Sequence, residues 1–343
     1  MGIPVILTAT NIDAPIIASI MASICTNSKA EINFHIIDCF LSHVNKQRIE
    51  KCKKIFNNFT INYIRLDLRP WLENYPELVK FNRGGVLKYV IPSILTFLDK
   101  AILLDNDVIF LDGADIKDLY ETDLLQYTIA AVPLITLFGN GLWSRPKLAN
   151  YEKLGLSSRD AVFDPAMILV DIKRWNDEKL TEKILDITRT LVCQRKLSAC
   201  YDGMFKLFDG KYLKLDKSWN VPYHYAKIFC FGKKSGPDEM KALHFNYSGD
   251  NNKPWNNKEL EGSNYFWKYA SMTVFKAILE NNPPSRIHNP QYWSKLKYRR
   301  KIINLIIKIL VNRKRYRKLK KHAEQFFADS KSRIIRCLGE LYF

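Results

Sequence analysis

The sequence lacks the features of a secreted, disulfide-bonded protein. Its seven cysteines are scattered along the 343 residues, are odd in number and include no C-x-x-C pair. This pattern argues against a disulfide framework and against a zinc ribbon, and it is typical of a reducing compartment. The N-terminal segment MGIPVILTATNIDAP has no basic stretch ahead of an apolar run, so we predict that it is not a secretory signal.

Acidic residues are scarce at the C-terminal end of the chain. Residues 286–343 carry 17 Lys or Arg against three acidic residues, so they hold +14 of the total net charge of +18. The preceding 285 residues hold only +4 and are therefore nearly neutral. A strongly cationic segment attracts anionic surfaces, which are nucleic acids or acidic lipid headgroups.

The basic segment has a short apolar centre. Residues 302–311 contain Ile and Leu at helical spacing, and Asn304 and Lys308 interrupt them. Since roughly 20 apolar residues are needed to cross a bilayer, this stretch cannot span one. Three interpretations stay open: adsorption on a membrane surface, packing on the body, and binding of nucleic acid. We predict membrane-surface attachment for residues 281–343, which the proline-rich stretch at 281–290 links to a body of residues 1–280.

The body alternates between strands and helices. The predicted strands cover residues 3–10, 32–38, 61–68 and 101–111, and the predicted helices cover residues 13–29, 46–59 and 85–98. Pro92, inside the last of these helices, predicts a kink or a late helix start. We therefore predict an α/β fold with an open, mostly parallel sheet. In such sheets ligands bind beyond the carboxyl ends of the strands.

Two carboxylates follow an apolar run in the segment AILLDNDVIFLDG, residues 101–113. Because side chains alternate along a strand, we expect Asp105 and Asp107 on one side and Asn106 on the other. Paired carboxylates repel where the dielectric constant is low, and a divalent cation removes that cost. Mg²⁺ or Mn²⁺ bridging the phosphates of a nucleotide is therefore predicted. An Asp-x-Asp pattern also occurs by chance, so it is weak evidence alone.

A second candidate segment is KALHFNYSGDNNKPW, residues 241–255. His244 follows a short apolar run and is expected at another strand end, where an imidazole added to two carboxylates favours Mn²⁺. Gly249 permits close approach of the backbone to a ligand, and Lys253 provides a charge suited to a diphosphate. Taken alone, a histidine at this place is more often a hydrogen-bonded structural residue.

Four segments, in order, resemble glycosyltransferase family 8. They are LLDNDVIFLD, FDPAMILVDIKRW, YDGMFKLFDGKYLKLDKSWNV and HFNYSGDNNKPW, and the resemblance covers about residues 3–270. It is greatest to bacterial lipopolysaccharide galactosyl- and glucosyltransferases. It implies a GT-A fold and retaining transfer of a hexose from a UDP-sugar to a glycolipid or oligosaccharide acceptor such as the lipopolysaccharide core. The implied cofactor is Mn²⁺, with Mg²⁺ as the alternative.

The resemblance also implies roles for individual residues. The metal ligands would be Asp105, Asp107 and His244. The residues on the donor would be Lys88 near the sugar, Asn106 on the ribose, and Gly249 and Lys253 on the diphosphate. The basic tail of these relatives attaches to the inner face of the cytoplasmic membrane. A cytoplasmic, peripheral protein with an anionic membrane surface as partner is therefore expected, and no nucleic-acid partner.

Three segments depart from the family pattern. Thr8 and Thr10, in TATN, stand where relatives have an acidic pair that holds the base and the ribose. Asp164, in FDPA, replaces an amide that faces the sugar, and CYD, ending at Asp202, keeps only the last acid of D-Q-D. Retention requires either a carboxylate nucleophile or attack by the acceptor hydroxyl on the same face of the sugar. Asp202 and Asp164 are the candidate carboxylates. A hydrogen-bonding role for Asp202 and a turn-forming role for Asp164 are the alternatives.

Two other functions stay open at this stage. One is a family member without turnover that binds a sugar or a surface, which the altered TATN and FDPA segments motivate. The other is a metal-dependent enzyme acting on nucleic acid, with the same acidic pair and the basic tail. The nearly neutral charge of the body argues against the second.

Overall fold

The computed structural model describes most of residues 2–281. The exceptions within this range are residues 68, 76–77, 79–82, 135–150, 159–160, 195, 197–200, 232–239 and 247–252. Two expectations therefore lie outside the described residues: the placement of Gly249 and nearly all of the predicted tail at 281–343.

A seven-stranded sheet forms the centre of the body, in the order β3-β2-β1-β4-β7-β6-β8. Its strands are β1 (Ile3–Ala9), β2 (Ile32–Asp38), β3 (Phe59–Arg65), β4 (Lys100–Leu104), β6 (Ile129–Pro133), β7 (Phe163–Asp171) and β8 (Leu213–Lys214). Neighbouring strands are parallel except where β7 pairs with β4 and β6, and both of those pairings are antiparallel. The predicted α/β fold with a mostly parallel sheet is confirmed.

A second, three-stranded sheet has the order β5-β10-β9. Its strands are β5 (Val108–Phe110), β9 (Val221–Pro222) and β10 (Ala242–His244). The chain passes from β4 in the large sheet to β5 in the small one within residues 105–107. The expectation of one continuous strand at 101–111 is therefore wrong. An unbroken apolar run does not reveal a change of sheet, because both strands are buried.

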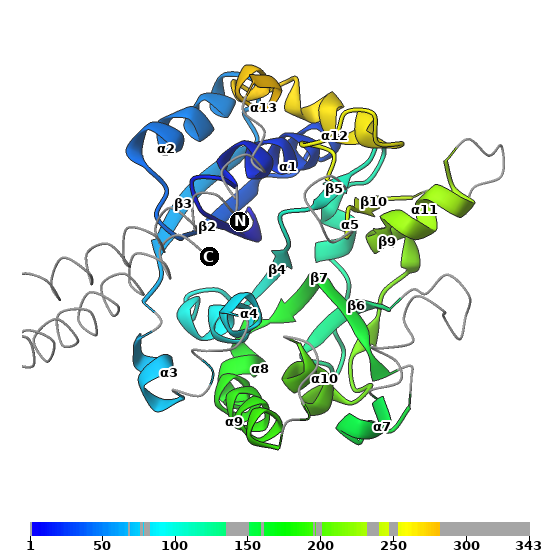
Figure 1. The fold of residues 1–343 in the computed structure, drawn as a ribbon. Helices are drawn as coiled ribbons and strands as arrows, with labels where there is room; N and C mark the ends of the chain where they lie inside the picture. Colours follow the sequence, from blue (N-terminus) through cyan, green and yellow to red (C-terminus); the bar gives the residue numbers. More distant parts are fainter. Residues whose placement is uncertain are drawn as a thin grey trace, which may run out of the picture.

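Helices cover both faces of the large sheet (Figure 1). On one side lie α1 (Ala14–Asn27), α2 (His43–Glu50), α12 (Ser263–Ala270) and α13 (Lys276–Asn281), and on the other lie α3 (Arg69–Asn74), α4 (Arg83–Ile94), α8 (Ile172–Asp177), α9 (Leu180–Cys193) and α10 (Asp202–Phe208). The remaining helices are α5 (Ile116–Tyr120), α7 (Tyr151–Leu154), α11 (Tyr223–Phe229) and the 3₁₀ helices η1 (Lys51–Lys54) and η4 (Lys217–Asn220).

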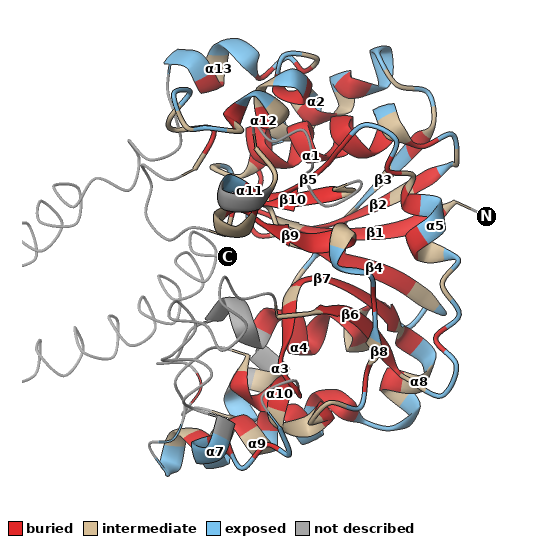
Figure 2. Ribbon diagram, turned by 90° about the vertical axis from the view of Figure 1, so that its right-hand side faces the viewer, coloured by how far each residue is buried: buried red, intermediate tan, exposed pale blue. Residues whose placement is uncertain are grey.

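Burial on both faces explains why the strands read as almost continuous apolar runs (Figure 2). In β1, Val5 and Leu7 belong to the core beside α1, whereas Ile6 belongs to the core beside α4 and α9. Alternate residues of the strand thus contribute to two separate cores, as in a parallel sheet covered by helices on both sides.

Two predicted helices have different bounds in the structure. The helix expected at 46–59 is α2 followed by η1, and residue 59 already begins β3. The helix expected at 85–98 is α4, which ends at Ile94, so Pro92 lies in its last turn. The described residues include no helix long and apolar enough to cross a membrane.

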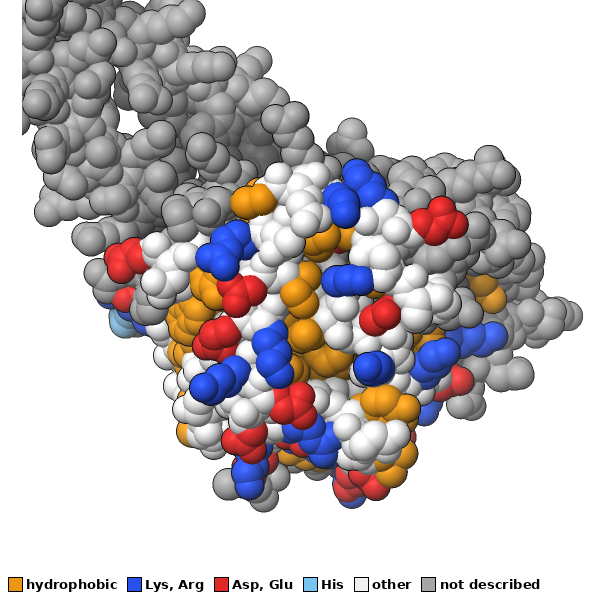
Figure 3. Space-filling model, turned by 90° about the horizontal axis from the view of Figure 1, so that it is seen from below, with side chains coloured by type: hydrophobic (Ala, Val, Ile, Leu, Met, Phe, Trp, Pro, Cys, Tyr) orange, Lys and Arg blue, Asp and Glu red, His pale blue; other side chains and the backbone are white. Residues whose placement is uncertain are grey.

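The lower face of the body carries charges of both signs, interspersed with apolar side chains (Figure 3). On α9, Arg189 pairs with Asp186 at 2.9 Å, and at the start of α8, Arg174 lies 3.6 Å from Asp171. This mixture agrees with the nearly neutral charge of the first 285 residues. The described residues on the face in view form no strongly basic surface.

Candidate active site

The acidic pair lies at the junction of the two sheets. Asp105 follows the last residue of β4, and its backbone N–H donates to the carbonyl of Ala166 in β7 at 2.8 Å. Asp107 precedes β5, and its carbonyl accepts from the N–H of Phe245, just after β10, at 2.8 Å. The carboxyl end of one strand is therefore fixed to elements from two distant parts of the sequence. This is the sheet edge at which ligands bind in open α/β folds.

Asp107 is surrounded by basic groups. Nζ of Lys253 lies 2.7 Å from its Oδ2 and also donates to the carbonyl of Phe245 at 2.5 Å. Nε2 of His244 lies 3.3 Å from Oδ1. Burial by itself raises the pKa of Asp107, but His244 and Lys253 outweigh this effect and hold the pKa well below its usual range. Asp107 is therefore an anion at neutral pH.

Asp105 pairs with a different lysine. Nζ of Lys88, in α4, lies 2.7 Å from Oδ1 of Asp105, and it also donates to the carbonyl of Pro165. Partial burial raises the pKa of Asp105, Lys88 opposes that rise, and the neighbouring carboxylate of Asp107 adds to it. The two acids are thus close enough for each to disfavour the charge of the other. Lys88 and Lys253 offset this repulsion, since each lies against one of the two acids.

His244 ends β10, as the sequence predicted for a residue at a strand end. It is buried between two carboxylates: Asp107 is near Nε2, and Oδ2 of Asp164 lies 3.3 Å from Nδ1. Burial alone lowers the pKa of His244, but Asp164 and Asp107 reverse the shift and raise the pKa to about 10. The distance between Nδ1 and Oδ2 of Asp164 is that of an ion pair, but the two groups are not oriented for a hydrogen bond. The buried Nδ1 therefore has no hydrogen-bond partner.

Asn106 reaches the carboxyl end of β1. Its Nδ2 donates to the carbonyl of Thr8 in β1 at 2.7 Å, and its buried Oδ1 has no hydrogen-bond partner. Thr10 lies just after β1, and both its N–H and its Oγ1 donate to Oδ2 of Asp13, at 2.9 and 2.6 Å. The side chain of Thr10 is therefore already bound within its own turn.

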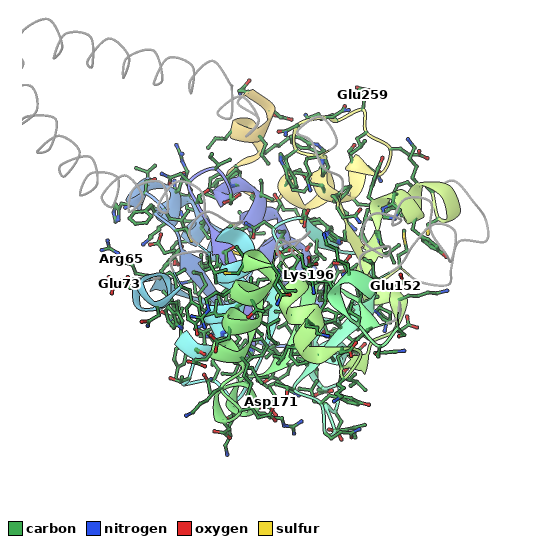
Figure 4. All side chains as sticks on the ribbon, turned by 60° about the horizontal axis from the view of Figure 1, so that its bottom comes forward. Arg65, Glu73, Glu152, Asp171, Lys196 and Glu259 are labelled. Carbon is green, nitrogen blue, oxygen red and sulfur yellow. The ribbon has the colours of Figure 1, made fainter. Side chains whose placement is uncertain are left out.

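Asp202 begins α10 and is buried, with 3% of its surface exposed. The preceding residue, Tyr201, places its ring 5.2 Å from Nζ of Lys88, which in turn holds Asp105. The start of α10 is thus linked to the acidic pair through one lysine. By contrast, the acidic residues labelled in Figure 4 lie around the outside of the body: Glu73, Glu152, Asp171 and Glu259.

Sequence reasoning missed two groups near these residues. Tyr201 lies over Lys88, and His224 of α11 lies 3.3 Å from Oδ1 of Asn246 through its Nδ1. Burial lowers the pKa of His224, and His244 lowers it further. Tyr201 is the middle residue of the CYD segment, but the segment does not reveal its contact with Lys88. No local pattern marks His224, which α11 carries.

The donor set suits a divalent cation. Two carboxylates and one imidazole are ligands that Mn²⁺ accepts, and Mg²⁺ accepts the carboxylates more readily than the imidazole. In the described part of the chain, however, no three His, Cys, Asp or Glu side chains stand in position to hold a metal ion. A lysine ammonium group lies against each acid. The residues fit the cation by their chemistry, and each ammonium group contacts one oxygen of its carboxylate.

Similarity to known proteins extends over most of the body. The family model described as "Glycosyl transferase family 8" matches residues 5–259. General stress protein A of Bacillus subtilis (strain 168) is 22% identical over 278 residues, which are 76% of this chain and 91% of that protein.

Two solved structures support the fold. The bifunctional glycosyltransferase WbbM, in its apo form, has a TM-score of 0.65 and 18% identity over 81% of this chain. The match covers 51% of WbbM, so the chain spans about half of that protein. The galactosyltransferase LgtC, solved with donor and acceptor sugar analogues, has a TM-score of 0.64 and 17% identity over 79% of this chain and 96% of its own. The fold is thus that of the GT-A enzymes, and this chain belongs to glycosyl transferase family 8 as a glycosyltransferase.

Proposed function

We propose that the protein transfers a hexose, galactose or glucose, from a UDP-sugar to a glycan acceptor, with retention of configuration at the sugar. The observation that carries this proposal is the cluster at the sheet junction, where Asp107 contacts both His244 and Lys253 and lies beside Asp105. A departing diphosphate needs positive charge close to it. The cluster combines a lysine with a donor set for a cation.

Asp105, Asp107 and His244 would hold Mn²⁺, with Mg²⁺ as the alternative. When bound, the cation neutralises charge on the phosphate oxygens of the donor. Lys253, which now donates to Asp107, would transfer its contact to the diphosphate. Lys88 would lie near the donor sugar, since it bridges Asp105 and the carbonyl of Pro165.

The donor nucleotide and the acceptor would contact further groups. Asn106 would bind the ribose through its unpaired Oδ1, and Thr8 and Thr10 would lie beside the base. Gly249 would approach the diphosphate through its backbone. Since LgtC was solved with donor and acceptor sugar analogues, a glycan acceptor, such as a lipopolysaccharide core, is the proposed second substrate.

The location follows from the tail. Residues 281–343 would bind the anionic inner surface of the cytoplasmic membrane, which would bring the body to a lipid-linked acceptor. Asp202 remains the candidate for a carboxylate that acts on the sugar, because it is buried at the start of α10, next to the residue that covers Lys88.

A thermal-shift panel tests the proposed ligands. Nucleoside diphosphates with different bases, and UDP-hexoses, are each added with and without Mn²⁺, because a ligand that binds the folded protein raises its melting temperature. UDP with Mn²⁺ should give a larger shift than either alone. Equal shifts in melting temperature with every base would contradict a UDP-sugar donor.

Asp107→Asn tests whether the acid pair is needed for metal-dependent turnover. It removes one negative charge without changing the shape of the side chain, so the fold should persist while metal-dependent turnover falls by at least about a hundredfold, roughly 2.7 kcal/mol. Hydrolysis or transfer from UDP-hexose in Mn²⁺ is the measurement. If the variant keeps most of the activity, the acid pair does not bind the cation. If the unaltered protein binds UDP-hexose without turnover, it is a sugar-binding module instead.

A further inference from the structure

Asp164 contacts the ring of His244, although the family resemblance places a sugar-facing amide at this position. Its side chain is buried, with 5% of the residue exposed, and its Oδ2 lies 3.3 Å from Nδ1 of His244. The other ring nitrogen, Nε2, lies 3.3 Å from Oδ1 of Asp107. The imidazole is thus held between one carboxylate of the acid pair and one carboxylate outside it.

The segment that carries Asp164 is fixed on several sides. Oδ1 of Asp164 accepts from the N–H of Ala166 at 3.0 Å, so the carboxylate cannot turn freely. The carbonyl of Pro165 accepts from Lys88, and the carbonyl of Ala166 accepts from the N–H of Asp105 at 2.8 Å. The start of β7 is therefore held in a constant position relative to the acid pair, with Oδ2 of Asp164 directed at the ring.

The two ring nitrogens of His244 have different surroundings. Nε2 faces Asp107 and the lysine that contacts it, whereas Nδ1 is buried beside Asp164 and lacks a properly directed hydrogen bond. A buried donor or acceptor without a partner is costly. A small rotation of the ring would direct Nδ1–H at Oδ2 of Asp164. Metal-binding histidines commonly hold a carboxylate in this way, and the contact fixes which nitrogen faces the metal.

We propose that Asp164 is a positioning residue that holds His244 through Nδ1 and so keeps Nε2 directed at the cation site beside Asp107. This inference rests on the proposed function, because it requires a cation at the acid pair. It gives Asp164 a different role from the nucleophile left open by the sequence. Both of its carboxylate oxygens are engaged, one with the backbone of Ala166 and one with His244.

Mn²⁺ binding to the full-length chain, measured in the presence of UDP from the electron paramagnetic resonance signal of free Mn²⁺, provides the first test. Asp164→Ala should weaken Mn²⁺ binding by about 10- to 100-fold, the usual effect of removing such a carboxylate. Asp164→Asn should give a smaller loss, because it keeps an acceptor for Nδ1–H. The control is Asp171→Asn, at the opposite end of the same strand, where Asp171 caps α8 (Figure 4). It should leave Mn²⁺ binding unchanged, since Asn caps helices equally well.

The second readout is the spin-echo modulation of bound Mn²⁺ by imidazole nitrogen, recorded at saturating Mn²⁺. The modulation should be present in the unaltered protein, absent in His244→Ala and reduced in Asp164→Ala. Unchanged affinity in both Asp164 variants would overturn the inference. So would weaker binding with full nitrogen modulation, because Asp164 would then act only through its charge. If the unaltered protein binds no Mn²⁺, the proposed function fails. If it binds Mn²⁺ and only the effect of the Asp164 variants is absent, the role of Asp164 fails and the proposed function stands. Melting curves of each variant identify any loss of fold.

Discussion

At the residue scale, each acid of the Asp-x-Asp pair has a lysine of its own. Lys88 contacts Asp105 and Lys253 contacts Asp107, each at 2.7 Å. Two carboxylates without a cation would repel each other, and the two ammonium groups compensate for this repulsion. The same lysines compete with a divalent cation for the carboxylate oxygens. Binding of the cation and of the nucleotide should therefore be coupled, because a diphosphate offers Lys253 another anion.

Substitution of Lys253 by Met tests this competition. In Lys253→Met, Mn²⁺ alone should bind about tenfold more tightly, because Asp107 loses its competing cation, and UDP should bind about tenfold more weakly, since a charged hydrogen bond is lost. Titration calorimetry with each ligand separately measures both effects. Lys258→Met is the control, because Lys258 is exposed and pairs with Glu280 away from the acid pair. Mn²⁺ affinity that stays constant in Lys253→Met would contradict the competition.

His244 predicts a pH dependence of stability in the metal-free protein. Its pKa is raised from 6.5 to about 10 by Asp164 and Asp107, against the opposing effect of burial. The folded chain therefore keeps a proton that the unfolded chain releases. The resulting stabilisation is complete below pH 6.5 and is lost as the pH rises through about 10.

Urea unfolding in the presence of a chelator, repeated between pH 6 and 10.5, measures this dependence. In the unaltered protein, the free energy of unfolding should fall as the pH rises, with a slope that approaches about one proton. His244→Asn should lack this slope. His43→Asn, at an exposed position in α2, should keep it. The prediction is contradicted if the two variants have the same pH profile.

The acid pair, His244 and Lys253 could be identified from the sequence, because each follows a short apolar strand or lies in a recognisable segment. Their contacts with one another could not all be foreseen. The pairing of Asp164 with His244 joins residues 80 positions apart, and no periodicity encodes such a contact. Tyr201 and His224 were missed for the same reason, since helix packing positions them.

At the scale of elements, α9 and α10 approach closely at a single glycine. A Cβ atom built on Gly203 would lie 2.0 Å from Oγ1 of Thr188 and 3.2 Å from the carbonyl of Ile184. Gly203 follows Asp202, and Tyr201 precedes both, so the spacing of the two helices sets the position of the residue that covers Lys88.

Gly203→Ala should therefore destabilise the protein by about 1–3 kcal/mol, the usual cost of overpacking. Urea unfolding measures the change. Adding Thr188→Ala removes the hydroxyl group in the way, so the double variant should recover part of the loss relative to the sum of the single variants. Strictly additive effects would show that the contact with Thr188 is not the cause.

The strand–helix–strand unit formed by β1, α1 and β2 was predictable from local pattern alone. The reversed direction of β7 was not, because the choice of a neighbouring strand depends on residues far away in the chain. The break between β4 and β5 was missed because both segments are apolar and buried, and only the two acids between them mark the change of sheet.

At the scale of the whole molecule, the body should fold without the basic segment. The described elements end with α13, which packs on the body through the buried Leu279. A chain that lacks residues 286–343 should therefore melt at an unchanged temperature and lose its binding to anionic lipid vesicles, because +14 of its charge is gone. Co-sedimentation with anionic and with zwitterionic vesicles measures this. Full binding by the shortened chain would refute the membrane role of the tail.

The junction between the two sheets has a consequence for synthesis of the chain. β5 pairs directly with β10, whose residues follow it by more than 130 positions, and the imidazole and the ammonium group that contact Asp107 lie at or beyond that strand. During translation the acid pair therefore emerges from the ribosome long before these two basic groups. A nascent polypeptide that stops short of β10 lacks two of the three basic groups that contact the acid pair. The complete constellation forms only when almost the entire body has been made.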